Sequence, residues 1–220
     1  MIKTVIEKEL LLLGNAKSGI FSLLTLILTF IFIFHYSLER ISPLTLESLI
    51  GLKWSILFLL SFVYIGQSVW EERDGGALRI NVVYLPASIF FLTKGLVIFL
   101  VLFFVNLLVI GLFYIFFTAM KIHTFQEFFY HVVFLIPAGL SLSFLGITLT
   151  VLSNATRLKE VLLPILLIPL SIPVLLFGME AERNLLLFAG STGKPLLVLF
   201  AFCTFYGSLG IVVQELSEEI

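Results

Sequence analysis

Residues 95–118 read GLVIFLVLFFVNLLVIGLFYIFFT, a stretch without a single charged side chain. About 20 consecutive apolar residues form a helix long enough to cross a hydrocarbon core about 30 Å thick. Five more strongly apolar runs of similar length occur at residues 19–38, 51–70, 128–152, 161–179 and 195–214. The sequence therefore predicts an all-α, polytopic membrane protein with six transmembrane helices.

The composition agrees with this class of protein. Hydrophobic residues make up 60% of the 220 residues and charged residues 12%, and the mean hydropathy is +1.17. Soluble domains carry about 25% charged residues. The six runs use more than half of the chain, so a single membrane domain over residues 1–220 is predicted. The net charge of −1 gives no indication of a nucleic-acid partner, and one cysteine, Cys203, allows no internal disulfide.

Residues 1–18 are predicted to remain attached to the first span, because they contain acidic residues and no small-residue cleavage site follows the apolar run. Apolar side chains recur there at helical spacing, with Lys3 and Glu7 on the other side. The apolar positions are Ile2, Val5, Ile6, Leu10 and Leu13. This pattern is typical of an amphipathic helix that lies along the membrane surface. An ordinary helical extension of the first span is the alternative.

The orientation is predicted from basic residues near the span ends, which are more frequent on the cytoplasmic side. With the N-terminus inside, the inner segments hold Lys3, Lys8, Lys17, Arg73, Arg79, Lys94, Arg157 and Lys159. The outer segments hold Arg40, Lys53, Lys121, Arg183 and Lys194. Eight against five favours cytoplasmic termini.

The connection at residues 71–94 is the longest and most charged one between two spans. Gly75 and Gly76 interrupt the helix that leaves the second span, and residues 77–85 are predicted to form a short helix that ends at Pro86. The residues of interest are Glu72, Arg73, Gly75, Gly76, Leu78, Arg79, Val82, Leu85 and Pro86. Leu78, Val82 and Leu85 share one face of that helix, which suits docking onto a soluble motor protein. A simple interfacial loop is the alternative.

The fifth span, residues 161–179, contains Pro164, Pro169 and Pro173. Each proline removes a backbone donor and crowds the preceding turn, so the helix is predicted to be kinked or partly unwound. Backbone groups freed at membrane depth need cover, which predicts a position inside the bundle. A purely structural kink is the alternative. The fourth span carries small residues four apart, Gly139 with Ser143 and Gly146 with Thr150, which favour close helix packing.

Charged side chains are not expected near the middle of any span, and Asn106 is the one amide predicted there. Ion-coupled transporters usually place charged groups at that depth. The sequence therefore indicates that any energy comes from outside the chain. The segment around Gly193 and Lys194 fails as a phosphate-binding loop, because Phe188 and Pro195 occupy two positions that such a motif defines. No nucleotide-binding or hydrolase motif is recognised, so we expect a protein that is not an enzyme.

Three histidines, His35, His123 and His131, are predicted near the outer ends of the first, third and fourth spans. Imidazole can ligate haem iron, so a cluster there could contact a porphyrin. No spacing motif links the three, which favours the simpler interpretation that each hydrogen-bonds head groups or water.

Two segments carry a resemblance to known families. Glu72-Arg73-x-x-Gly76-x-Leu78, with Pro86-x-Ser88 and Lys94-Gly95, resembles the signature loop of ABC-2-type membrane subunits. Residues 154–174 read NATRLKEVLLPILLIPLSIPV, which is similar to the corresponding stretch of the haem exporter protein B family (CcmB). The resemblance extends over essentially the whole chain.

This resemblance implies a permease subunit of the cytochrome c maturation complex, in a bacterial inner membrane with both termini cytoplasmic. It implies a CcmA-like cytoplasmic ATPase that binds ATP, CcmC- and CcmD-like haem-handling membrane subunits, a periplasmic haem chaperone, membrane lipid and a second copy of the chain as partners. Haem would be cargo and not a cofactor held by this chain. Residues 71–94 would couple to the ATPase, aided by residues 154–160 with Arg157, Lys159 and Glu160, and the proline-rich fifth span would move or line the path.

Two alternatives remain open at this point. One is a generic ABC-2 exporter of lipid, polysaccharide or drug. The other, from a different class, is a membrane scaffold that holds partners together without transport. Association with an ATPase separates the scaffold from both transporters.

Overall fold

The computed structural model describes residues 17–38, 45–74, 86–117, 125–154, 159–187 and 190–218, and these residues form six long helices. The helices are α2 (Lys17–Leu38), α3 (Leu46–Asp74), α5 (Ala87–Phe116), α6 (Phe125–Asn154), α7 (Lys159–Leu186) and α8 (Gly193–Glu218). All six are long and apolar enough to cross a membrane, and no strand occurs among the described residues. The predicted fold class is confirmed.

Several helices extend beyond the predicted spans. The helix predicted at 95–118 begins at Ala87, and the one predicted at 161–179 continues to Leu186. Both predictions stopped where charged residues begin, but Lys94 and Glu182 are buried inside the bundle and their helices continue past them. Of the predicted interfacial helix at 1–18, residues 1–16 lie outside the described residues, and the last two residues begin α2.

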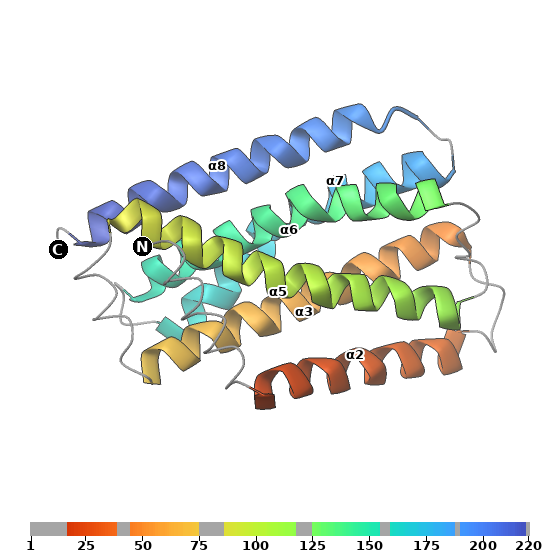
Figure 1. Ribbon diagram of the computed structural model, residues 1–220, viewed down its shortest axis with the longest axis horizontal. Helices are drawn as coiled ribbons and strands as arrows, with labels where there is room; N and C mark the ends of the chain where they lie inside the picture. The colour runs from red at the N-terminus through yellow and green to blue at the C-terminus, as the bar shows by residue number, and fades with distance from the viewer. Residues whose placement is uncertain are drawn as a thin grey trace.

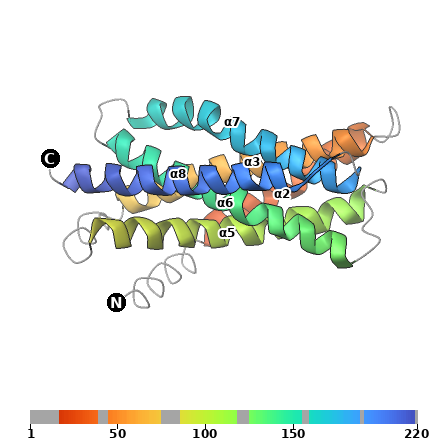
Figure 2. The same ribbon diagram turned by 90° about the horizontal axis from the view of Figure 1, so that it is seen from above.

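Successive helices run in opposite directions, so the bundle has two distinct ends (Figure 1). At the end where the C-terminus lies, α3, α6 and α8 finish and α5 and α7 begin; we call it the carboxy-terminal end. At the opposite end, α2, α5 and α7 finish and α3, α6 and α8 begin. The view from above shows the same lengthwise order (Figure 2).

Helix α6 is the centre of the bundle and packs against α3, α5, α7 and α8. Over an 18-residue apolar stretch of this helix, 78% of the residues are buried. The predicted small-residue stripe explains this close approach: a Cβ atom at Gly146 would lie 2.7 Å from Cδ1 of Ile65 on α3, too close for a side chain. Because lipid chains are as apolar as buried side chains, the hydrophobic effect contributes little to helix association in membranes, and close packing of this kind is a main source of it.

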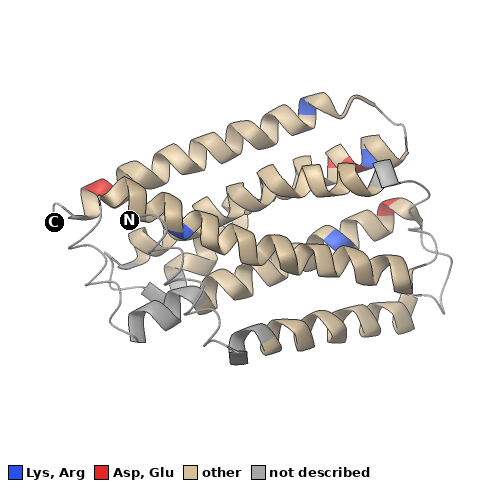
Figure 3. Ribbon diagram, in the orientation of Figure 1, with Lys and Arg blue, Asp and Glu red and all other residues tan. Residues whose placement is uncertain are grey.

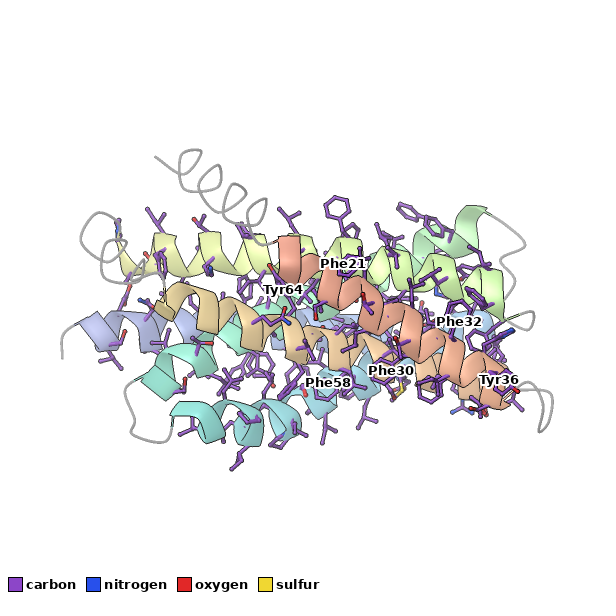
Figure 4. All side chains as sticks on the ribbon, turned by 90° about the horizontal axis from the view of Figure 1, so that it is seen from below. Phe21, Phe30, Phe32, Tyr36, Phe58 and Tyr64 are labelled. Atoms are coloured by element: carbon purple, nitrogen blue, oxygen red, sulfur yellow. The ribbon has the colours of Figure 1, made fainter. Side chains whose placement is uncertain are left out.

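Helix α2 lies at the edge of the bundle, where it packs against α3 and α5. Leu23, Ile27 and Ile31, spaced four residues apart, are its buried seam. Aromatic side chains such as Phe21, Phe32 and Tyr36 project from the helix (Figure 4), and between 53% and 72% of each is exposed. This outward face has the composition of a surface in contact with lipid chains.

Helix α7 does not occupy the interior position that its prolines predicted. Only 28% of its span is buried, and the helix is continuous from Lys159 to Leu186. The prediction of an interior position is therefore wrong. The helix is not unwound, and the kink at its prolines stays a prediction. The Tyr206 hydroxyl of α8 donates a 2.7 Å hydrogen bond to the carbonyl of Leu170, which links the two helices close to Pro169 and Pro173.

Candidate functional site

The predicted coupling loop is shorter than residues 71–94. Glu72 and Arg73 belong to the last turn of α3, and Pro86 stands directly before the first residue of α5. Residues 87–94 form the first two turns of α5, so the loop assignment is wrong for them. The remaining predicted contacts lie outside the described residues; they are Gly75, Gly76, Leu78, Arg79, Val82 and Leu85.

The second predicted loop, residues 154–160, is shorter too. Asn154 ends α6, Lys159 and Glu160 begin α7, and Arg157 lies outside the described residues. The helix ends that flank both connections meet at the carboxy-terminal end of the bundle (Figure 1).

Towards the opposite end, a cluster of polar side chains is buried between α3, α6 and α7. Lys53 and Glu182 form a hydrogen-bonded ion pair in which each side chain is 1% exposed. The indole Nε1 of Trp54 donates a 2.5 Å hydrogen bond to Oε2 of Glu182. Nδ1 of His131 lies 3.1 Å from Oε1 of the same carboxylate. We call Lys53, Trp54, His131 and Glu182 the buried cluster; few other charged residues lie along the described helices (Figure 3).

Three helices position these side chains. Lys53 and Trp54 are consecutive residues in the third turn of α3, and His131 lies in the second turn of α6. Glu182 is one turn beyond Gly178 on α7. A Cβ atom at Gly178 would lie 2.6 Å from Cζ3 of Trp54, so the glycine leaves room for the indole against α7. The ring of Tyr114 from α5 meets His131 edge-on, with 6.1 Å between centroids.

A second ion pair joins α3 to α7 with the charges reversed. Nε and Nη2 of Arg183 lie 2.9 and 2.8 Å from Oε1 of Glu47, and both side chains are more than half exposed. The acid is on α3 in this pair and on α7 in the buried cluster. The two pairs together therefore define which turns of α3 and α7 face each other.

The structure corrects two expectations about charge. Lys53, counted among the outer basic residues, is buried a third of the way along its span, since it is the eighth residue of Leu46–Gln67. His131 contacts a carboxylate and not head groups or water, so the simpler interpretation is wrong for this histidine. His35 contacts the rings of Phe116 and Phe117, and His123 lies outside the described residues.

Sequence reasoning missed the buried cluster for an identifiable reason. Lys53 and Glu182 are 129 residues apart, and no spacing rule connects them. The available signal was Lys53 itself, a charged residue inside an apolar run, because such residues in spans normally have a partner.

Replacing Gly178 by alanine is expected to destabilise the bundle, because the new methyl group displaces Trp54 from α7 and weakens its hydrogen bond to Glu182. The matched control is Gly111→Ala on α5, where a Cβ atom meets nothing within 4 Å and alanine favours the helix by about 1 kcal/mol. Thermal unfolding in detergent measures both. The first variant should melt lower than the native chain and the control no lower; equal melting temperatures would contradict the assigned packing.

The six long apolar helices define a multi-pass membrane protein. The chain belongs to the CcmB family: the family model described as CcmB protein matches residues 1–211. Family membership supports a haem exporter permease role in cytochrome c maturation, within the Ccm ABC transporter complex. The resemblance noted in the sequence is thus confirmed. No curated protein matches the chain.

Proposed function

We propose that this chain is the membrane subunit through which a CcmA-like cytoplasmic ATPase drives release of a haem-loaded periplasmic chaperone. The main support is that both predicted coupling connections lie at the carboxy-terminal end. One connection joins the end of α3 to the start of α5, and the other joins the end of α6 to the start of α7. A motor that binds there acts on four helices at once. Because α6 is the most buried helix, a displacement of its end reaches the whole core.

The proposal places the carboxy-terminal end in the cytoplasm of a bacterium, with the protein in the inner membrane. The count of basic residues that supports this orientation changes when two buried lysines are left out. Lys53 and Lys94 are both buried within helices and do not contact the membrane surface as loop residues do. Removing one from each side of the eight-to-five count leaves seven inner against four outer basic residues.

Cysteine labelling tests this orientation. In a background where Cys203 is replaced by serine, Arg79→Cys and Arg157→Cys are expected to react only with reagents that reach the cytoplasm. Thr45→Cys, an exposed position at the opposite end, should react from the periplasm. The reverse pattern in intact cells would invert the assigned topology.

Loss of the chain from a bacterium that makes c-type cytochromes is expected to abolish covalent haem attachment to cytochrome c and leave b-type cytochromes unchanged. The physical reason is that only c-type maturation requires the chaperone cycle that the proposal assigns to this complex. Haem staining of denatured membrane proteins measures the attachment. Normal c-type cytochromes would favour the generic ABC-2 exporter instead, and plasmid-borne native chain controls for indirect effects.

A further inference from the structure

The buried cluster has the chemistry of a carboxylate-binding site. Three nitrogen atoms surround one carboxylate: Nζ of Lys53 and Nδ1 of His131 at Oε1 of Glu182, and Nε1 of Trp54 at Oε2. A cation combined with an N–H donor, here Lys53 with the indole of Trp54, is an arrangement by which proteins bind ionised carboxylates. Each side chain of the set is at least 97% buried, so this carboxylate is bound away from water.

The carboxylate and the groups that bind it come from different parts of the bundle. Lys53, Trp54 and His131 are on α3 and α6, in which 56% and 78% of an 18-residue apolar stretch are buried. Glu182 is on α7, where only 28% of an 18-residue apolar stretch is buried, so most of this helix surface is not covered by the rest of the bundle. Helix α7 also begins at Lys159, beside the second connection that the proposed function assigns to the ATPase. A shift of α7 therefore withdraws the carboxylate and leaves the three nitrogen groups in place.

The two charged residues of the buried cluster differ in how far they lie from the ends of their helices. Glu182 is the fifth residue from the end of α7, so a displacement of the helix by about 6 Å along its axis brings the carboxylate to the level at which α7 now ends. Lys53 is the eighth residue of α3 and has no such exit. An unpaired ammonium buried at this depth is costly. When Glu182 is withdrawn, binding of another carboxylate beside Lys53 is therefore strongly favoured.

We propose that Lys53, Trp54 and His131 form a carboxylate-binding site for a haem propionate, which Glu182 occupies in the present conformation and vacates when α7 moves. This inference rests on the proposed function for the choice of haem, since the shared chemistry is that of any membrane-soluble carboxylate. Exchange of one carboxylate for another keeps Lys53 paired throughout. The site thereby recognises the acidic edge of the porphyrin and makes no use of its iron.

The test measures binding to the purified full-length chain in nanodiscs, with Trp70→Phe so that fluorescence reports on Trp54. The probes are haem, its dimethyl ester and palmitate. Glu182→Ala is expected to bind haem about tenfold or more tightly than the native chain, because the internal competitor is gone. The ester should show no such gain, since it lacks ionised carboxylates. Adding Lys53→Met to Glu182→Ala should abolish the gain, and Glu47→Ala, at the same end of the bundle, should behave as native.

Three results would overturn the inference: an equal gain for the ester, a gain that survives Lys53→Met, or palmitate competing as well as haem, which would assign the site to a lipid carboxylate. Glu182→Gln, which nearly keeps the native shape, is measured in parallel and should show a gain of the same sign. No gain in either variant would also refute the site. Because no ATPase is present, failure here leaves ATPase coupling intact, and failure of ATPase association leaves this result unaffected.

Discussion

Replacing Lys53 by methionine lowers the free energy of unfolding by about 3–5 kcal/mol, the usual consequence of leaving one buried charge without its partner. Methionine is unbranched like lysine and only one heavy atom shorter, so the main loss is electrostatic and not a cavity effect. Glu182 would remain at 1% exposure with only Trp54 and His131 near its carboxylate. Thermal unfolding in detergent, with the native chain alongside, measures the change.

The double variant Lys53→Met with Glu182→Gln is expected to recover most of that stability, because it removes both charges and keeps an oxygen acceptor for Trp54. The matched control is Arg183→Met, which breaks the exposed pair with Glu47 and should cost no more than about 1 kcal/mol. If Lys53→Met and Arg183→Met had equally small effects, the buried cluster would not hold α3 and α7 together.

Replacing Leu78 by aspartate is expected to weaken ATPase association about tenfold or more, since a central apolar contact in an interface carries a large share of the binding energy. Leu78 leads the apolar face predicted for residues 77–85, and a carboxylate there would be desolvated without a partner. Gly76→Pro should have a similar effect by changing the chain direction before that face. Co-purification of the ATPase and the yield of haem-bearing cytochrome c are the measurements.

Leu78→Met is the control for this prediction, because it keeps an apolar side chain of similar volume and should retain both association and yield. All three variants should accumulate in the membrane, since the substitutions lie outside the six helices. Unchanged association in Leu78→Asp would show that the ATPase binds elsewhere on the chain.

The helices were predictable because apolar run length is a direct physical requirement of the bilayer. Their ends were not, because a charged residue in a sequence does not reveal whether it is paired. Helix α7 passes residue 179 and carries Glu182 into the bundle, where Lys53 compensates its charge. Helix α5 likewise starts before Lys94, which is buried.

The candidate site, too, could be predicted from the sequence only in part. Local patterns indicated the connection after α3, where an apolar face follows two glycines, and close packing along α6, where Gly146 faces Ile65. The buried cluster depends on contacts between residues far apart in the chain. Three prolines suggested a buried α7, but little of this helix is buried. Its position depends on how it packs against α3, α6 and α8, and the prolines do not reveal those contacts.

The most direct test of the account is the ATP turnover of a CcmA-like ATPase reconstituted in nanodiscs with the native chain or with the Leu78→Asp variant. A permease driven by an external motor predicts that the ATPase binds the native chain, that its turnover differs from that of the ATPase alone, and that Leu78→Asp abolishes the difference. The central claim would be contradicted if the ATPase did not bind the native chain and had the same turnover with and without it.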